Sequence, residues 1–200
     1  MTARMSPRDL AIWEAARPWL DVRSNDEHTL ISWRLAGALL AFYPQAAEAV
    51  VLPAILLHDI GWKKMPADKL ARAVGPHPEF PELQRDHELA SVELGQAILA
   101  RLDLGLDGGA ILAIVDGHDT TRHARSIEDM LVKDADKLWR FTPHGVSTIG
   151  GWFESTATDT LTMLEDFVLP SFLAPEARAM ARGFLADNWA AAERHERMAI

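Results

Sequence analysis

The feature of this 200-residue chain that most limits its possible folds is an apolar run that ends in a histidine and an aspartate. Residues 50–57 are apolar and include Pro53, and His58, Asp59 and Gly61 follow directly. Burying a carboxylate beside so much apolar surface is costly unless it is paired or bound to a metal ion. At a helix end, His58 and Asp59 can both reach into one cleft, and Gly61 stands where the chain often needs positive φ. The run predicts a helix that ends in a polar site.

The composition limits the class of protein. A hydrophobic content of 48% and a charged content of 24% are ordinary for a soluble globular chain of one domain. Cysteine is absent, so any metal must be held by imidazole and carboxylate groups. The net charge of -9 argues against polymeric nucleic acid and anionic membranes as partners, but it leaves room for a small phosphorylated substrate. The chain shows neither a membrane span nor a signal peptide, so we expect a cytoplasmic protein.

Helical spacing of apolar residues runs through the whole chain, whereas alternating strand-like runs are missing. This pattern predicts an all-α fold in a single domain, residues 1–200. Residues 62–81 are rich in lysine, proline and glycine and are expected to form a loop that could cover a site. The C-terminal third is expected to be helical around residues 158–169 and 175–194 and to serve as scaffold. The expected helix starts are Ser6-Pro7, Ser24 with Glu27 as a capping box, Pro44, Glu82 and Ser126.

Four histidines fall on the apolar stripes of different expected helices or at their ends: His28, His58, His87 and His118. A single inward histidine is usually a core residue with a satisfied hydrogen bond. Four of them, with Asp59 and a further acid, would be too costly to bury without a shared partner. Nitrogen and oxygen ligands without sulfur suit Mn, Fe, Co, Ni or Zn ions, so we predict one or two divalent transition-metal ions. The remaining histidines are expected at the surface: His77, His123, His144 and His195.

The order of these residues resembles the HD-domain superfamily of metal-dependent phosphohydrolases. The family pattern is a histidine, a His-Asp pair after a helical hairpin, and a distant aspartate in an Ala-Asp-x-Leu context, which correspond here to His28, His58-Asp59 and Asp136. The additional His87 and His118 resemble the branch that can hold two metal ions. The resemblance covers residues 26–139. It implies an HD-type helical bundle with its core in residues 24–142 and a C-terminal helical extension in residues 143–200.

Two assignments stay open from the residues alone. His118-Asp119 is a second His-Asp pair, but Asp119 opens a polar loop and leaves too little chain before Asp136 for further ligand helices. On the helix after Ser126, periodicity places Asp134 on the apolar side and Asp136 nearly opposite, whereas the family pattern puts the ligand at Asp136. We follow the family pattern and expect Asp134 to support the ligands or to replace Asp136 among them.

The resemblance implies hydrolysis of a small phosphoester, a nucleotide or another phosphomonoester, by a metal-activated water. His58 and Asp59 would be the central catalytic residues. Basic side chains close to the expected ligands would bind the phosphate of the substrate: Lys63, Arg85 and Lys137. Among the tryptophans, Trp33, Trp139 and Trp152 are expected in the core, whereas Trp62 stands directly beside the site.

The same order of six ligands also resembles the mixed-valent di-iron oxygenases of the HD fold, which cleave C–C or C–P bonds with O₂. Ligand types alone do not separate the two classes of enzyme, because a fold does not fix a chemistry. The basic residues near the His-Asp pair favour hydrolysis. A binding domain without catalysis is a third reading, against which the complete ligand set weighs. The sequence predicts neither the identity of the substrate nor the oligomeric state.

Overall fold

The computed structural model describes residues 4–75 and 77–198, and every regular element in this part of the chain is helical. The predicted all-α fold class is confirmed. No helix among these residues is both long enough and apolar enough to cross a bilayer. The α-helices are α1 (Pro7–Ala16), α2 (Asn25–Leu40), α3 (Glu48–Leu57), α4 (Glu82–Leu102), α5 (Gly108–Val115), α6 (Ile127–Trp139), α7 (Pro143–Phe153), α8 (Ala157–Met163) and α9 (Pro175–Met198).

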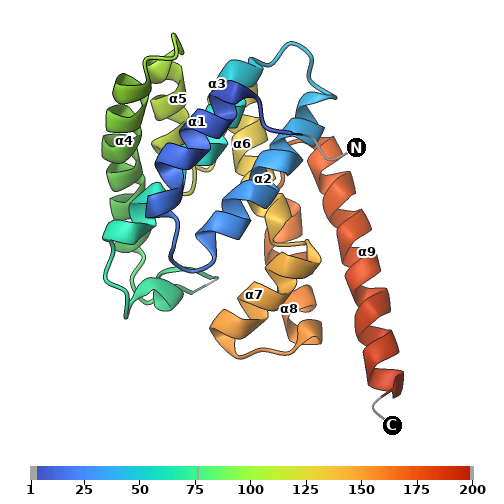
Figure 1. The fold of residues 1–200 in the computed structure, drawn as a ribbon. Coiled ribbons are helices and arrows are strands. Elements are labelled where there is room, and N and C mark those ends of the chain that lie inside the picture. Colours follow the sequence, from blue (N-terminus) through green and yellow to red (C-terminus); the bar gives the residue numbers. More distant parts are fainter. Residues whose placement is uncertain (1–3, 76, 199–200) are drawn as a thin grey trace.

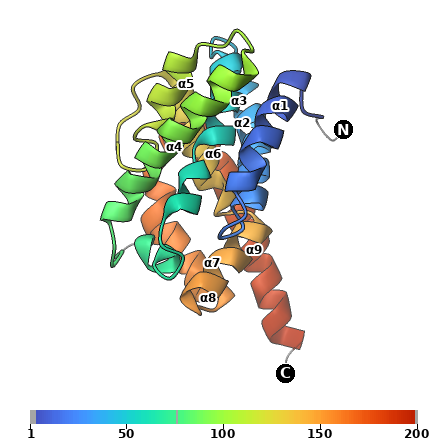
Figure 2. The ribbon, with the colours of Figure 1, turned by 60° about the vertical axis from the view of Figure 1, so that its left-hand side comes forward.

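Helix α3 forms the centre of the bundle. It packs against α1, α2, α5 and α6, and Figures 1 and 2 show it enclosed by them. Every residue from Val51 to Leu57 is buried, which is the pattern of a helix that is apolar on all sides. The C-terminal end of α3 therefore lies inside the protein, and His58 and Asp59 leave it there.

Gly61 brings α4 close to the end of α3. The short helix η2 (Ile60–Lys64) follows Asp59 and packs against α4. A Cβ atom on Gly61 would lie 2.0 Å from the backbone oxygen of His87 and 2.6 Å from the backbone nitrogen of Ser91. Gly61 is not among the glycines with positive φ, so the expected reason for it was wrong. The position requires glycine because two backbones touch, and this contact brings His87 beside the His-Asp pair.

The predicted helix starts at Ser6 and Ser126 are confirmed. Each serine precedes its helix in an extended conformation, and its hydroxyl accepts a hydrogen bond of 3.1 Å from the backbone nitrogen three residues on. This bond satisfies one of the free N–H groups in the first turn. The predicted start of α4 at Glu82 is also confirmed.

The predicted start of α2 after Ser24 is confirmed, but the predicted capping box of Ser24 and Glu27 was wrong. The backbone of Ser24 is left-handed, with a φ of 58°, and its side chain makes no capping hydrogen bond. A capping serine needs extended backbone to aim its oxygen at the first turn. The start expected at Pro44 was also wrong, because α3 begins at Glu48 after a series of turns.

The chain after α6 adds a second layer at one end of the bundle (Figure 1). Helix α7 was not predicted. The expected helix over residues 158–169 is α8 followed by the π-helical turn η4 (Leu164–Val168) and the 3₁₀ turn η5 (Leu169–Ser171). Helix α9 packs against α6 and α8, and in both views its C-terminal part extends beyond the bundle. One hydrophobic cluster joins residues from α1 to α9.

Candidate metal centre

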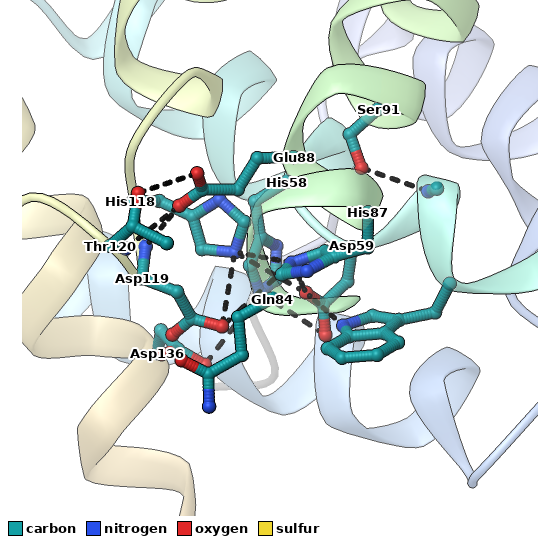
Figure 3. A network of polar contacts seen from close by, with 12 residues as sticks. His58, Asp59, Gln84, His87, Glu88, Ser91, His118, Asp119, Thr120 and Asp136 are labelled. Atoms are coloured by element: carbon teal, nitrogen blue, oxygen red, sulfur yellow. Dashed lines mark hydrogen bonds and ion pairs between the residues drawn. The ribbon is translucent and has the colours of Figure 1, made fainter. Parts of the chain in front are cut away.

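The six predicted metal ligands lie together in one buried cluster. They come from five parts of the chain: α2, the end of α3, α4, the loop after α5, and α6. Figure 3 shows five of the side chains converging from the end of α3, α4, the loop after α5, and α6. The cluster consists of His28, His58, Asp59, His87, His118 and Asp136.

The carboxylate of Asp59 lies between two pairs of histidines. Its Oδ2 atom is 3.4 Å from Nε2 of His28 and 3.7 Å from Nε2 of His58. Its Oδ1 atom is 3.5 Å from Nε2 of His87 and 3.4 Å from Nε2 of His118. Each oxygen therefore faces a different pair, and the cluster has two halves that Asp59 joins.

Each half contains a second carboxylate. Oδ1 of Asp136 lies 3.3 Å from Nε2 of His28 and 3.6 Å from Nε2 of His58. In the other half, Oδ2 of Asp119 lies 3.8 Å from Nε2 of His87 and 3.9 Å from Nε2 of His118. Asp119 is partly exposed, and we had set it aside as the start of a polar loop. Its position directly after His118 repeats the His58-Asp59 arrangement, and that repetition was the signal for it.

The spacing of the donor atoms fits divalent transition-metal ions. Two ligand atoms about 2.1 Å from one ion, at 90–110° to each other, lie roughly 3.0–3.4 Å apart. The Nε2 atoms of His28 and His58 are 3.0 Å apart, and those of His87 and His118 are 3.3 Å apart. Three groups of three donors have one ligand atom each within 4.8 Å of one another. The cluster thus offers imidazole and carboxylate donors at ligand spacing in both halves.

Main-chain oxygens orient three of the four histidines. When Nδ1 donates to a carbonyl group, Nε2 carries no proton in the neutral ring and is free to bind a metal. Nδ1 of His28 is buried without a hydrogen-bond partner among the described residues. The three contacts are His58 to Ile55 at 2.8 Å, His118 to Val115 at 2.9 Å and His87 to Leu83 at 3.3 Å.

Burial and charge give the histidines different protonation states. Burial lowers the pKa of His28 to about 4, against the attraction of Asp59 and Asp136. Burial also opposes a charge on His118, but the hydrogen bond to Asp59 and the charge of Asp119 outweigh it and raise the pKa of His118 to about 10. Burial likewise opposes a charge on Asp59, but the surrounding histidines hold its pKa well below the ordinary value. At neutral pH a metal ion must therefore displace a proton from His118.

Asp134 lies on the other side of α6. Its side chain is fully buried and accepts hydrogen bonds from the backbone nitrogens of Leu173, at 3.1 Å, and Ala174, at 2.7 Å. It also pairs with Lys137 at 3.5 Å. Asp136 faces the histidines, whereas Asp134 fastens α6 to the start of α9. Asp134 therefore has a structural role, and it does not lie among the clustered metal-ligand candidates.

The structure places the three predicted phosphate-binding residues in ion pairs away from the cavity beside the donors. None of them is among the described residues that line this cavity. Their contacts are Lys63 with Asp21 at 2.7 Å, Arg85 with Glu88 at 2.8 Å, and Lys137 with Asp134 and the backbone oxygen of Ser171.

Arg85 has a supporting position instead. Its partner Glu88 is fully buried and accepts hydrogen bonds from the backbone nitrogens of Asp119, at 2.9 Å, and Thr120, at 2.8 Å (Figure 3). Lys133, from α6, donates to the backbone oxygen of His118 at 3.0 Å. These contacts fix the loop that carries His118 and Asp119.

A cavity of about 320 Å³ opens onto the acids of the cluster. Two arginines that sequence reasoning missed, Arg23 and Arg140, line this cavity. Arg140 pairs with Asp136 at 3.3 Å. The guanidinium group of Arg23 lies between the rings of Trp62 and Trp152, 4.6 and 4.5 Å from their centres. Its Nε and Nη1 atoms are buried and have no hydrogen-bond partner among the described residues. A buried cation without a partner is costly, so this group is available to an anionic ligand.

The backbone explains why Arg23 was missed. Arg23 and Ser24 are consecutive non-glycine residues with φ of 54° and 58°. Such strained backbone gathers at functional sites, and a sequence does not show it. The only signal was a basic residue five positions before His28.

The positions of the tryptophans agree only in part with those expected from the sequence. Trp62 stacks on His87 with ring centres 4.0 Å apart and donates to Oδ1 of Asp59 at 3.2 Å, so its place beside the site is confirmed. Trp33 is buried, as expected. Trp139 and Trp152, which we had assigned to the core, also line the cavity.

The other histidines lie apart from the donors in the described part of the chain. His77 and His123 are exposed. His144 is half-buried and contacts Glu27 and Trp139. The side chain of His195 lies outside the described residues.

Comparison with known proteins identifies the family. A family model described as the HD domain matches residues 25–140, more than half of the chain, and this range contains all six clustered residues. The chain belongs to the HD-domain family. No curated protein and no solved structure matches it. HD domains bind divalent metal ions and are mostly metal-dependent phosphohydrolases, so membership points to an enzyme with activity of the metal-dependent hydrolase type.

Proposed function

We propose that this HD-domain protein is a metal-dependent phosphohydrolase that acts on a small phosphomonoester. The observation that carries the proposal is that a donor cluster and two arginines border a single cavity. Divalent ions held by the cluster would activate a water and offset the charge of the phosphoryl oxygens.

The proposal gives the chain's own residues distinct tasks. The histidines with Asp59 and Asp136 hold the ions, with Asp59 between the two halves. Arg23 binds phosphate oxygens, because its buried Nε and Nη1 atoms have no hydrogen-bond partner in the described part of the chain. Arg140, already paired with Asp136, borders the same space and adds positive charge.

The size of the cavity and the net charge support a small substrate. About 320 Å³ suits a compact ligand rather than a polymer, and a charge of -9 disfavours nucleic acid and anionic membranes. We keep the cytoplasm as the proposed location.

A di-iron oxygenase is the second candidate. The position of Asp59, with one oxygen toward each pair of histidines, supports this candidate as well as the first, because such an arrangement would serve two irons or two other ions. The unpartnered arginine in the cavity favours phosphate chemistry. Hydrolysis is therefore our first choice.

The test loads metal-free protein separately with Mn²⁺, Co²⁺, Ni²⁺, Zn²⁺ and Fe²⁺ and measures phosphate release from a panel of phosphomonoesters that includes nucleotides. Oxygen uptake is recorded in parallel. We expect phosphate release with at least one metal and none in metal-free protein. Turnover without metal would contradict the proposal, and oxygen uptake by an iron-loaded protein that releases no phosphate would select the oxygenase.

A further inference from the structure

The side chains that line the cavity are of two chemical kinds. One kind comprises His28 and the acids of the cluster with the two arginines. The other kind comes from residues 149–168, outside the range matched by the HD family model, and forms an apolar wall that meets the first kind where Arg23 lies over Trp152. None of the side chains from this segment that line the cavity has a carboxylate, amide, hydroxyl or cationic group. They include Trp152, Phe153, Met163, Leu164, Phe167 and Val168.

This wall leaves large apolar side chains uncovered. Phe167 is 61% exposed and Phe153 is 40% exposed, although aromatic side chains gain free energy when they are removed from water. Phe167 lies in the π-helical turn η4, and single π-helical turns occur often at functional sites. From the facing loop, Gly75 approaches so closely that a Cβ atom on it would lie 2.9 Å from the ring of Phe153. The loop that carries Gly75 therefore borders the cavity on the same side as Phe153.

We infer that the ligand of this site joins an anionic phosphate to an apolar alkyl or aryl group. The inference deepens the proposed function and rests on it for the phosphate. The indole N–H of Trp152 is the one polar side-chain group among the lining residues of the 149–168 wall, so most hydroxyl groups of a sugar would lose their water there without gaining hydrogen-bond partners. An apolar group placed against Phe153 and Phe167 would instead cover surface that is now exposed.

The test uses methyl-, butyl- and octylphosphonate, which keep the anionic group and have no ester bond to hydrolyse. Calorimetric titration of the metal-loaded protein should show affinity rising by about fourfold for each methylene group that reaches the wall. Phe167→Ala should reduce this dependence on chain length while leaving the affinity for methylphosphonate unchanged. The matched control is Phe42→Ala, because Phe42 is 58% exposed and is not among the residues that line the cavity.

Equal affinity for the three phosphonates would overturn the inference, and so would tighter binding of a nucleoside or sugar monophosphate than of octylphosphonate. An unchanged chain-length dependence in Phe167→Ala would overturn the assignment of the wall. The proposed function fails in a different way. A protein that binds longer phosphonates more tightly but releases phosphate from no ester supports the inferred ligand and rejects hydrolysis.

Discussion

The ligand-bearing bundle of residues 25–140 and the C-terminal extension of residues 143–198 differ in how much their sequences reveal. In the bundle, a histidine or an aspartate on an apolar stripe is conspicuous, because burying it requires a partner. In the extension, Phe153 and Phe167 look the same in sequence whether they pack in a core or line a cavity. We expected scaffold there and found the apolar wall of the cavity. A polar residue within an apolar stretch of sequence indicates a site, whereas an apolar residue does not show whether it packs in a core or lines a cavity.

The largest effect should follow from Asp59→Asn in the bundle. The change removes the charge that both halves of the cluster share while nearly keeping the shape of the side chain. We expect phosphatase activity to fall by at least roughly 10²–10³-fold, because the transition state loses its charge stabilisation. Activity measured with a circular dichroism spectrum separates this loss from unfolding.

The exposed His77→Ala should keep full activity as the control for Asp59→Asn. Near-normal turnover in a folded Asp59→Asn protein would show that the cluster does not perform the chemistry.

Arg23→Ala tests where the two regions meet, because its guanidinium lies between Trp62 of the bundle and Trp152 of the extension. Loss of one charge-assisted contact to phosphate should lower kcat/KM by about 10–100-fold without changing the metal content. Steady-state kinetics with elemental analysis measure both quantities.

Lys63→Ala is the matched control for Arg23→Ala, since Lys63 is paired with Asp21. If the Lys63 variant lost activity and the Arg23 variant did not, the phosphate-binding residue would be Lys63, as first predicted from the sequence, and not Arg23.

Asp134→Ala tests the fastening of the extension to the bundle. The change leaves the backbone nitrogens of Leu173, which is partly exposed, and of Ala174, which is buried, without their acceptor. We expect a loss of about 2–4 kcal/mol in the free energy of unfolding, measured by urea denaturation, with unchanged metal content. The exposed Asp187→Ala should change stability by less than about 0.5 kcal/mol. Loss of metal from Asp134→Ala would make Asp134 a ligand after all.

Metal binding should release protons, and these protons should come from ligands in the bundle rather than from the extension. The pKa of His118 is raised to about 10, so the metal-free protein carries this proton at pH 7 and must lose it on binding. Affinity should therefore rise with pH by up to about tenfold per unit below pH 10 for this one group. His28, with a pKa lowered to about 4, is already neutral at pH 7 and adds nothing. Calorimetry in two buffers of different ionisation enthalpy should show at least one proton released, and zero release would refute the assignment.

Much of the fold and of the donor cluster could be predicted from the sequence, because helical spacing and buried polar groups follow local rules. Serine caps at Ser6 and Ser126 obeyed them. The remainder depends on contacts between distant segments. Gly61 is required by the approach of α4, and Arg23 points into the cavity from a strained turn. Periodicity favoured Asp134 over Asp136 because it reports burial, and Asp134 is buried against α9 rather than against the histidines.

The most direct test of the central claim is the number of transition-metal ions per chain, measured by elemental analysis after metal loading and dialysis. Seven side chains at ligand spacing, with one oxygen of Asp59 facing each pair of histidines, predict two retained ions. A single ion would remove the bridging role of Asp59. No retained ion, in a folded protein supplied with each metal in turn, would contradict the account.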